Sequence, residues 1–159
     1  MIFVTVGDSY PFDRLVRTVD LWAQARRRTD VFAQIGAEGC QPAFIPWIRR
    51  LEPVEFQRKL ETAEFIVAHA GMGTILAGLS AGKPLLVLPR RAALNEMQND
   101  HQVATAKHLE ANGRLTAVYS EEALTNQLDH LDELKFASRI SPFASPGLIS
   151  ALRTFIAGN

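Results

Sequence analysis

The sequence has a single cysteine, Cys40, among its 159 residues. One thiol cannot form a disulfide within the chain, nor a zinc site built on several cysteines, and it fits a reducing compartment. The chain also has a formal net charge of zero, because 17 basic side chains balance 17 acidic ones. Without a basic field the chain is not expected to bind nucleic acid non-specifically.

Several catalytic and metal-binding patterns are absent as well. The sequence contains no DxD triplet and no HExxH, and its His, Asp and Glu residues show no recognised metal spacing. We therefore expect no bound metal. The N-terminus lacks the basic segment of a secretory signal peptide, so we expect no such peptide.

One apolar stretch, residues 65–88, is long enough to span a bilayer. It contains His69, Lys83, Pro84 and four glycines, placed where a soluble strand–turn–helix–turn–strand would need them. We interpret it as the buried core of an α/β domain. The 47% hydrophobic content and the length of the chain suit one compact domain.

Short apolar runs alternate with segments of helical periodicity along the whole chain. The runs predict strands at 2–6, 31–35, 43–48, 64–69, 84–88 and 115–118. Helices are predicted from about 11 to 26–28, from 53 with Val54, Phe56, Leu60 and Ala63 inward, at 74–81, at 95–112, from 120, and at 147–157 after a linker at 137–147. This alternation predicts one α/β domain, residues 1–159, with a doubly wound, mostly parallel sheet.

Ligands bind such sheets at the carboxyl ends of the strands, and the segment 69–74 (HAGMGT) follows one predicted strand. Gly71 and Gly73 are expected to allow positive φ and a close ligand approach, and Thr74 to cap the next helix or donate to a phosphate. His69 is either a phosphate donor or a satisfied core side chain. The alternative for the whole segment is a tight turn whose glycines serve packing only.

Two further strand ends carry polar groups, at residues 7–9 and 89–91. After the second comes the segment 95–102 (NEMQNDHQ), whose hydrogen-bonding groups suit a polyhydroxylated ligand. The alternative is a solvated helix start with Asn99 or Asp100 as its cap. The glycine spacing, GxGxxxxG, is neither the dinucleotide fingerprint nor a P-loop.

Residues 69–90 (HAGMGTILAGLSAGKPLLVLPR) and 95–113 (NEMQNDHQVATAKHLEANG) together resemble the C-terminal, donor-binding domain of family 28 glycosyltransferases. Two further segments, 2–16 (IFVTVGDSYPFDRLV) and 31–36 (VFAQIG), narrow the resemblance to one branch of this family. They are similar to the stand-alone subunits of two-component enzymes, both bacterial exopolysaccharide enzymes and the dolichol-linked N-acetylglucosaminyltransferase. The resemblance covers nearly the whole chain and implies a Rossmann-like domain, one half of a GT-B glycosyltransferase.

The resemblance implies a site for a UDP-sugar, which is a donor substrate and not a cofactor. Gly71, Gly73 and Thr74 match the loop at the diphosphate, His101 and Gln102 match the pair that reads the sugar hydroxyls, and the glycine loop at 7 faces the partner domain. The implied binding residues are Gly7, Asp8, His69, Gly71, Met72, Gly73, Thr74, Arg90, Glu96, Asn99, His101 and Gln102. The sequence departs from the family at Ala77, where relatives often carry an acid for the ribose.

The resemblance also implies an inverting, metal-independent transfer of a hexose-type sugar to a lipid-linked acceptor. A membrane-anchored partner subunit would carry the acceptor site and hold this chain at the cytoplasmic face of the membrane. No residue of this chain is assigned as the catalytic base. The alternatives are a non-catalytic nucleotide-sugar-binding subunit and a Rossmann-type oxidoreductase. The apolar stripe of the last predicted helix is expected either to close the domain's own core or to recruit the partner.

Overall fold

The computed structural model describes residues 1–134, 139–140, 143 and 145–157. Its centre is a six-stranded sheet in the order β3-β2-β1-β4-β5-β6, and every pairing is parallel. The strands are β1 (Ile2–Thr5), β2 (Val31–Gln34), β3 (Trp47–Ile48), β4 (Phe65–Ala68), β5 (Leu85–Val87) and β6 (Thr116–Ala117). The predicted α/β fold with a doubly wound parallel sheet is confirmed.

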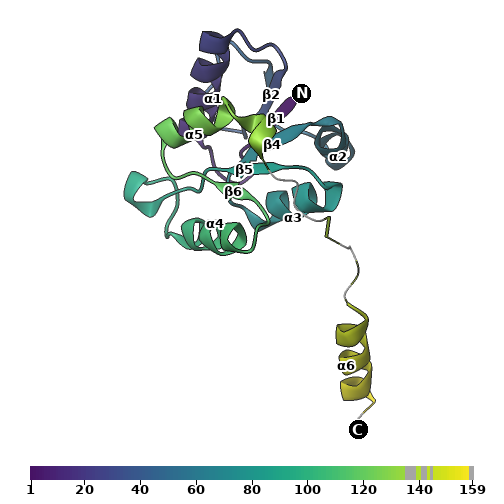
Figure 1. The fold of residues 1–159 in the computed structure, drawn as a ribbon. Helices are drawn as coiled ribbons and strands as arrows, with labels where there is room; N and C mark the ends of the chain where they lie inside the picture. Colours follow the sequence, from purple (N-terminus) through teal and green to yellow (C-terminus); the bar gives the residue numbers. More distant parts are fainter. Residues whose placement is uncertain (135–138, 141–142, 144, 158–159) are drawn as a thin grey trace.

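Helices cover both faces of the sheet (Figure 1). The helices on the sheet are α1 (Asp13–Arg26), α2 (Pro53–Thr62), α3 (Met72–Ala81), α4 (His101–Ala111) and α5 (Glu121–Leu128). The described residues also form α6 (Pro146–Ile156) and the short 3₁₀ turns η1 (Ala92–Leu94) and η2 (Leu131–Glu133). One core cluster joins α1 and α5 to the sheet, and the other joins α2, α3 and α4 to it. Strand order and helix placement therefore leave the carboxyl ends of the strands uncovered for a ligand.

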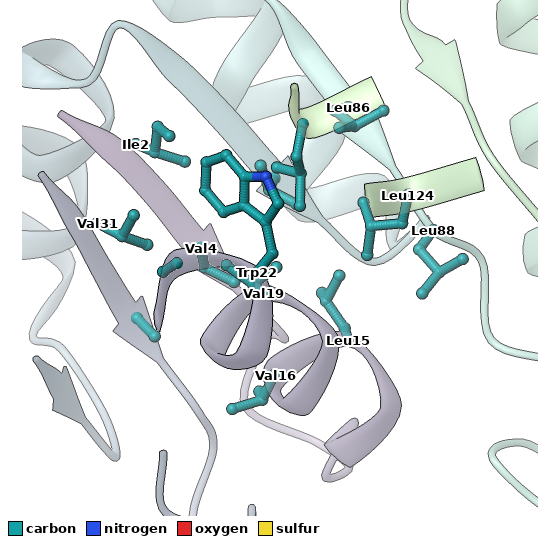
Figure 2. Packing of buried hydrophobic residues seen from close by; sticks show 14 of the residues in the cluster. Ile2, Val4, Leu15, Val16, Val19, Trp22, Val31, Leu86, Leu88 and Leu124 are labelled. Atoms are coloured by element: carbon teal, nitrogen blue, oxygen red, sulfur yellow. The ribbon is translucent and has the colours of Figure 1, made fainter. Parts of the chain in front are cut away.

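The two clusters follow from the period of two in the central strands. In β1, Ile2 and Val4 belong to the α1 side, whereas Phe3 belongs to the opposite side and packs on Phe56 of α2. Figure 2 shows the α1 side, where Trp22 of α1 packs among apolar side chains of the sheet. Both faces of β1 are buried, which explains its continuously apolar sequence.

Some predicted boundaries are wrong. The strand at 43–48 is only Trp47–Ile48, because the Asp20 carboxylate accepts hydrogen bonds from the backbone N–H groups of residues 43, 44 and 45. The strand at 115–118 is only Thr116–Ala117. Val54 is 82% exposed and does not face the core, although Leu60 and Ala63 do.

The helix predicted at 95–112 begins later, at His101. Asn95 adopts a left-handed conformation (φ 56°) that ends η1. The carboxylates of Glu96 and Asp100 then accept hydrogen bonds from the backbone N–H groups of Arg91 and Ala92. These side-chain bonds hold residues 95–100 as a loop in place of the first turns of the predicted helix.

The apolar stretch 65–88 forms β4, α3 and β5 inside the domain, as predicted. Among the described residues, no helix has both the length and the apolar content that a bilayer crossing requires. Of the predicted linker at 137–147, residues 137–138, 141–142 and 144 lie outside the described residues. Helix α6 begins at Pro146, and the Ser145 hydroxyl accepts from the Leu148 N–H. No α6 residue is buried, and the helix stands apart from the sheet (Figure 1).

Candidate functional site

Three strand ends meet at one edge of the sheet, because β1, β4 and β5 are neighbours and parallel. Gly7 follows β1 with a φ of +74°, His69 follows β4, and Arg90 follows β5. The His69 ring lies against Gly7: a Cβ at position 7 would come within 2.8 Å of His69 Nε2. The three predicted strand-end segments therefore lie at one edge of the sheet.

A cavity of about 410 Å³ opens at this edge. Its lining combines strand ends with the starts of α2 and α3: Gly7, Asp8, Ser9, Gln34, Leu51, Pro53, Phe56, His69, Gly71, Gly73 and Thr74. Five of the predicted site residues besides His69 thus line the same hollow. Met72, the first residue of α3, is 48% exposed beside it.

The N-terminus of α3 points into this cavity. The first intrahelical bond runs from the Ile75 N–H to the Gly71 carbonyl, so the N–H groups of residues 72–74 precede it. Three such groups and the positive end of the helix dipole form an anion-binding arrangement. A Cβ at Gly73 would meet no atom within 4 Å, so the approach to these groups is open.

The structure does not show the positive φ expected at the two glycines, and it excludes one of the two roles expected for Thr74. Gly71 has a φ of −81° and Gly73 is helical, so neither needs a positive φ. Thr74 does not cap α3 either, because Gly71 occupies the N-cap position. Instead, the Thr74 hydroxyl oxygen lies 3.2 Å from His69 Nε2. The third glycine of the pattern, Gly78, packs against Leu85 and Ile66.

Arg90 is 2% exposed and lies beneath the site, not in it. Its Nη1 donates to His69 Nδ1 (2.8 Å), and its Nη2 donates to the carbonyl oxygens of Val6 (2.9 Å) and Tyr10 (2.6 Å). The guanidinium also lies 4.9 Å from the ring centroid of Phe12. Arg90 was predicted to contact the ligand, but its hydrogen bonds are made to the protein.

Gln102 is buried as well, at 2% exposure. Its Oε1 accepts from the backbone N–H groups of Ala70 (3.2 Å) and Arg90 (3.1 Å), which ties the ends of β4 and β5 together. His101, one residue earlier, is exposed. The predicted pair is therefore divided: His101 is accessible to a ligand, and the Gln102 amide is engaged inside the protein.

A second cavity, of about 510 Å³, lies beside the first. It is lined by Tyr10, Asn95, Glu96, Met97, Gln98, Asn99 and His101. The Asn99 side-chain oxygen accepts from the His101 N–H (3.1 Å). Glu96 forms a two-pronged ion pair with Arg14 (2.6 and 2.9 Å), so its carboxylate is already partnered.

The loop after β1 is anchored by a chain of side chains that the sequence analysis missed. The Thr5 hydroxyl donates to Gln34 Oε1, and Gln34 Nε2 donates to Asp8 Oδ1 (2.7 Å). Gln34 is a polar residue at the end of an otherwise apolar strand, and this position could have indicated its role in the sequence. Asp8, predicted from the family pattern, is thereby held at the cavity.

A neutral imidazole and a buried cation lie side by side at the site. Burial, reinforced by the Arg90 charge, lowers the pKa of His69 to about 3, so its imidazole is neutral. Burial also lowers the pKa of Arg90, to about 10, against the opposing effect of Glu96, and Arg90 stays charged at neutral pH. Within the described residues, no group of three or more His, Cys, Asp and Glu side chains is placed to hold a metal ion.

A larger cavity, of about 720 Å³, lies between α1 and α5 and includes Trp22, Leu21 and Leu94. It contains neither the glycine loops nor the α3 N-terminus. The strand-end cavities, which combine backbone donors with polar side chains, are therefore the better candidate for a polar ligand.

Comparisons of the sequence with known proteins find relatives among glycosyltransferases. The UDP-N-acetylglucosamine--N-acetylmuramyl-(pentapeptide) pyrophosphoryl-undecaprenol N-acetylglucosamine transferase of Solibacter usitatus is 32% identical over 126 residues, which cover 74% of this chain and 31% of that protein. The UDP-N-acetylglucosamine transferase subunit ALG13 of Eremothecium gossypii is 34% identical over 93 residues, which cover 54% of this chain and 43% of that protein. The chain matches less than half the length of each.

A solved structure and a family model extend the comparison. The NMR solution structure of ALG13 superimposes with a TM-score of 0.60 at 17% identity, covering 95% of this chain and 93% of that one, which indicates a shared fold. The family model of the glycosyltransferase family 28 C-terminal domain matches residues 1–139, and this range contains both cavities. The chain therefore belongs to the glycosyltransferase family 28 C-terminal domain family.

Proposed function

We propose that this chain is the donor-binding subunit of a two-component glycosyltransferase. It transfers a hexose-type sugar from a UDP-sugar to a lipid-linked acceptor during polysaccharide or glycolipid synthesis. The observation that carries the proposal is the α3 N-terminus, open at Gly73 and lying beside His69 and Thr74 in the strand-end cavity. The names of the curated relatives, which are UDP-N-acetylglucosamine transferases, support the donor class.

The donor diphosphate lies on the backbone N–H groups at the start of α3. Fixed dipoles aimed at the departing diphosphate stabilise its charge in the transition state without reorganising. The sequence has no DxD triplet to bind a metal. The helix dipole and the His69–Thr74 pair therefore stabilise the diphosphate in place of a metal ion. The sugar then extends toward the second cavity, where Asn99 and His101 offer polar groups.

Ribose recognition differs from that of relatives with an acid after the glycine loop. Ala77 packs against the core cluster on the α3 side and offers no hydrogen bond to a ribose. Asp8, held at the cavity by Gln34, provides the one carboxylate among the described residues that line this cavity.

A membrane-anchored partner supplies the acceptor site, the general base and the localisation at the cytoplasmic face. The exposed stripe of α6 suits this role, because it presents Leu148, Ile149, Leu152, Phe155 and Ile156 to solvent. Burying each of these side chains contributes roughly 1.5–3 kcal/mol, which is enough in sum to hold a partner. The subunit designation of the ALG13 relatives supports assembly with another chain.

The proposal is tested by thermal-shift titration with UDP-N-acetylglucosamine, UDP-glucose, UDP-galactose and UDP-glucuronate, with NAD as the control for a dinucleotide enzyme. A ligand at about 100 times its Kd adds roughly 2.7 kcal/mol of stability. Stabilisation by a UDP-sugar and not by NAD is expected; the reverse, or no response to any UDP-sugar, contradicts the proposal. Radiolabelled transfer with and without the partner then separates an enzyme subunit from a non-catalytic binding subunit.

A further inference from the structure

The donor–acceptor pattern around His69 determines which ring nitrogen carries the proton. Arg90 Nη1 lies 2.8 Å from His69 Nδ1, and a guanidinium can only donate. Gln102 Nε2 lies 3.3 Å from the same Nδ1. The orientation of that amide is set, because its Oε1 already accepts two backbone N–H groups. Both neighbours of Nδ1 are therefore donors, and Nδ1 must be the unprotonated nitrogen.

The proton of the neutral ring consequently lies on Nε2, which faces Thr74 Oγ1 at 3.2 Å. A hydroxyl that accepts from Nε2–H keeps its own hydrogen for another acceptor. In the opposite tautomer, Nε2 would have to accept a hydrogen bond from the Thr74 hydroxyl, and that hydroxyl could then not donate to a ligand. The tautomer thus decides whether Thr74 offers a donor at the α3 N-terminus.

We propose that Arg90 is a positioning residue for the phosphate site: it holds His69 as the Nε2–H tautomer, and this leaves the Thr74 hydroxyl to donate to a phosphate oxygen of the ligand. The identity of the ligand rests on the proposed function. The tautomer is a property of the free protein and is tested without any ligand.

The surroundings of the ring reinforce this arrangement. Gly7 and Gly71 lie against the imidazole, and a Cβ at either would come within 2.8 Å of a ring atom, so the ring has little room to turn. Burial and the Arg90 charge both disfavour the protonated, doubly donating imidazolium. Arg90 also binds the Val6 and Tyr10 carbonyls, so one guanidinium holds both the ring and the loop that flanks it.

The first test is nitrogen-15 NMR of the imidazole in the full, ligand-free chain. We expect the neutral Nε2–H tautomer for His69 in the wild type, and a mixture of tautomers in Arg90→Met, with the amide spectrum reporting whether that variant is folded. Arg90→Lys keeps one donor and is expected to retain Nε2–H. A wild-type Nδ1–H tautomer overturns the proposal even if Arg90→Met does not fold. A folded Arg90→Met with pure Nε2–H overturns it too, since Gln102 would then suffice.

The second test measures UDP binding by calorimetry in a double-mutant cycle with Thr74→Val. In the wild-type background, loss of a hydroxyl donor to a charged oxygen is expected to weaken UDP binding roughly tenfold or more. In the Arg90→Met background the same substitution is expected to cost only two- to threefold, and equal costs in both backgrounds overturn the coupling. If wild-type protein does not bind UDP at all, the proposed function fails, whereas the tautomer result still decides the role of Arg90.

Discussion

Gly71 lies against the edge of the His69 imidazole, so closely that a Cβ at position 71 would come within 2.1 Å of His69 Cε1. The need for glycine there comes from the ring, because the φ of Gly71 is an ordinary −81°. Gly73, two residues later, has open space where its Cβ would be. The two glycines of one loop therefore serve different purposes, and substitutions can separate them.

Gly73→Val is expected to fold normally and to weaken UDP-sugar binding at least tenfold, because its side chain occupies the space in front of the helix N–H groups. Calorimetric titration and thermal unfolding measure the two effects. Gly71→Ala is the matched control: it displaces the His69 ring and is expected to lower the unfolding temperature. Unchanged affinity for the UDP-sugar in folded Gly73→Val would contradict a phosphate site at the start of α3.

Gln102→Ala is expected to reduce stability more than sugar selectivity. The substitution leaves the backbone N–H groups of Ala70 and Arg90 without their acceptor, at a cost of roughly 1–3 kcal/mol for each buried group. His101→Ala, at the exposed neighbour, is expected to stay within about 0.5 kcal/mol of the wild type. Urea unfolding of both variants checks this, and equal stabilities would show that Gln102 does not join the strand ends.

The pH dependence of stability is expected to carry a contribution from His69. Its pKa is about 3 in the folded protein, lowered by burial and by Arg90, against an ordinary 6.5. Below pH 6.5 the unfolded chain therefore binds a proton that the folded chain excludes, and stability falls by up to about 1.4 kcal/mol per pH unit toward pH 3. Urea unfolding at pH 7, 6 and 5 is expected to show a shallower decline for His69→Gln; parallel declines would mean that His69 is not buried and neutral.

Removal of residues 147–159 is expected to leave a folded, nucleotide-sugar-binding protein that no longer recruits the membrane partner. The described part of this segment has no buried side chain, so its loss removes no core contact. Thermal unfolding, UDP-sugar titration and co-purification with the partner test the three parts of the prediction. Unfolding of the truncated chain would place the helix in the domain core, and undiminished co-purification would place the docking surface elsewhere.

Sugar transfer by the assembled enzyme is expected to persist in EDTA. The sequence has no DxD triplet, and the proposed site provides backbone and side-chain donors for the diphosphate. The measurement is transfer of radiolabelled sugar with EDTA, followed by addition of magnesium or manganese. Activity that EDTA abolishes and the metal restores would contradict a metal-independent reaction.

The sheet and its site were predictable because their signals are local. Each central strand is a short apolar run, and the three polar strand ends follow from the parallel order of β1, β4 and β5. The features that sequence reasoning missed depend on partners far apart in the chain. The Asp20 carboxylate accepts hydrogen bonds from backbone N–H groups more than 20 positions away, and these bonds shorten the strand predicted there.

The same physics explains why two of the predicted site residues make hydrogen bonds within the protein. Glu96 and Gln102 are polar and follow a strand end, as ligand-binding residues do, but Glu96 pairs with Arg14, 82 positions away, and Gln102 reaches Ala70, 32 positions away. A spacing pattern does not distinguish a polar group that faces the ligand from one that holds the group facing it. The sequence was enough to predict that both residues lie near the site. Their roles there required the tertiary structure.

The Thr5–Gln34–Asp8 chain of hydrogen bonds fixes the loop after β1 from the neighbouring strand, before any ligand arrives. Ordering a free loop on binding would cost conformational entropy, roughly 1–2 kcal/mol for each residue whose backbone must be fixed. With the loop already preorganised by the sheet, that penalty belongs to folding and not to association. A nucleotide entering the cleft then keeps more of its interaction energy as affinity.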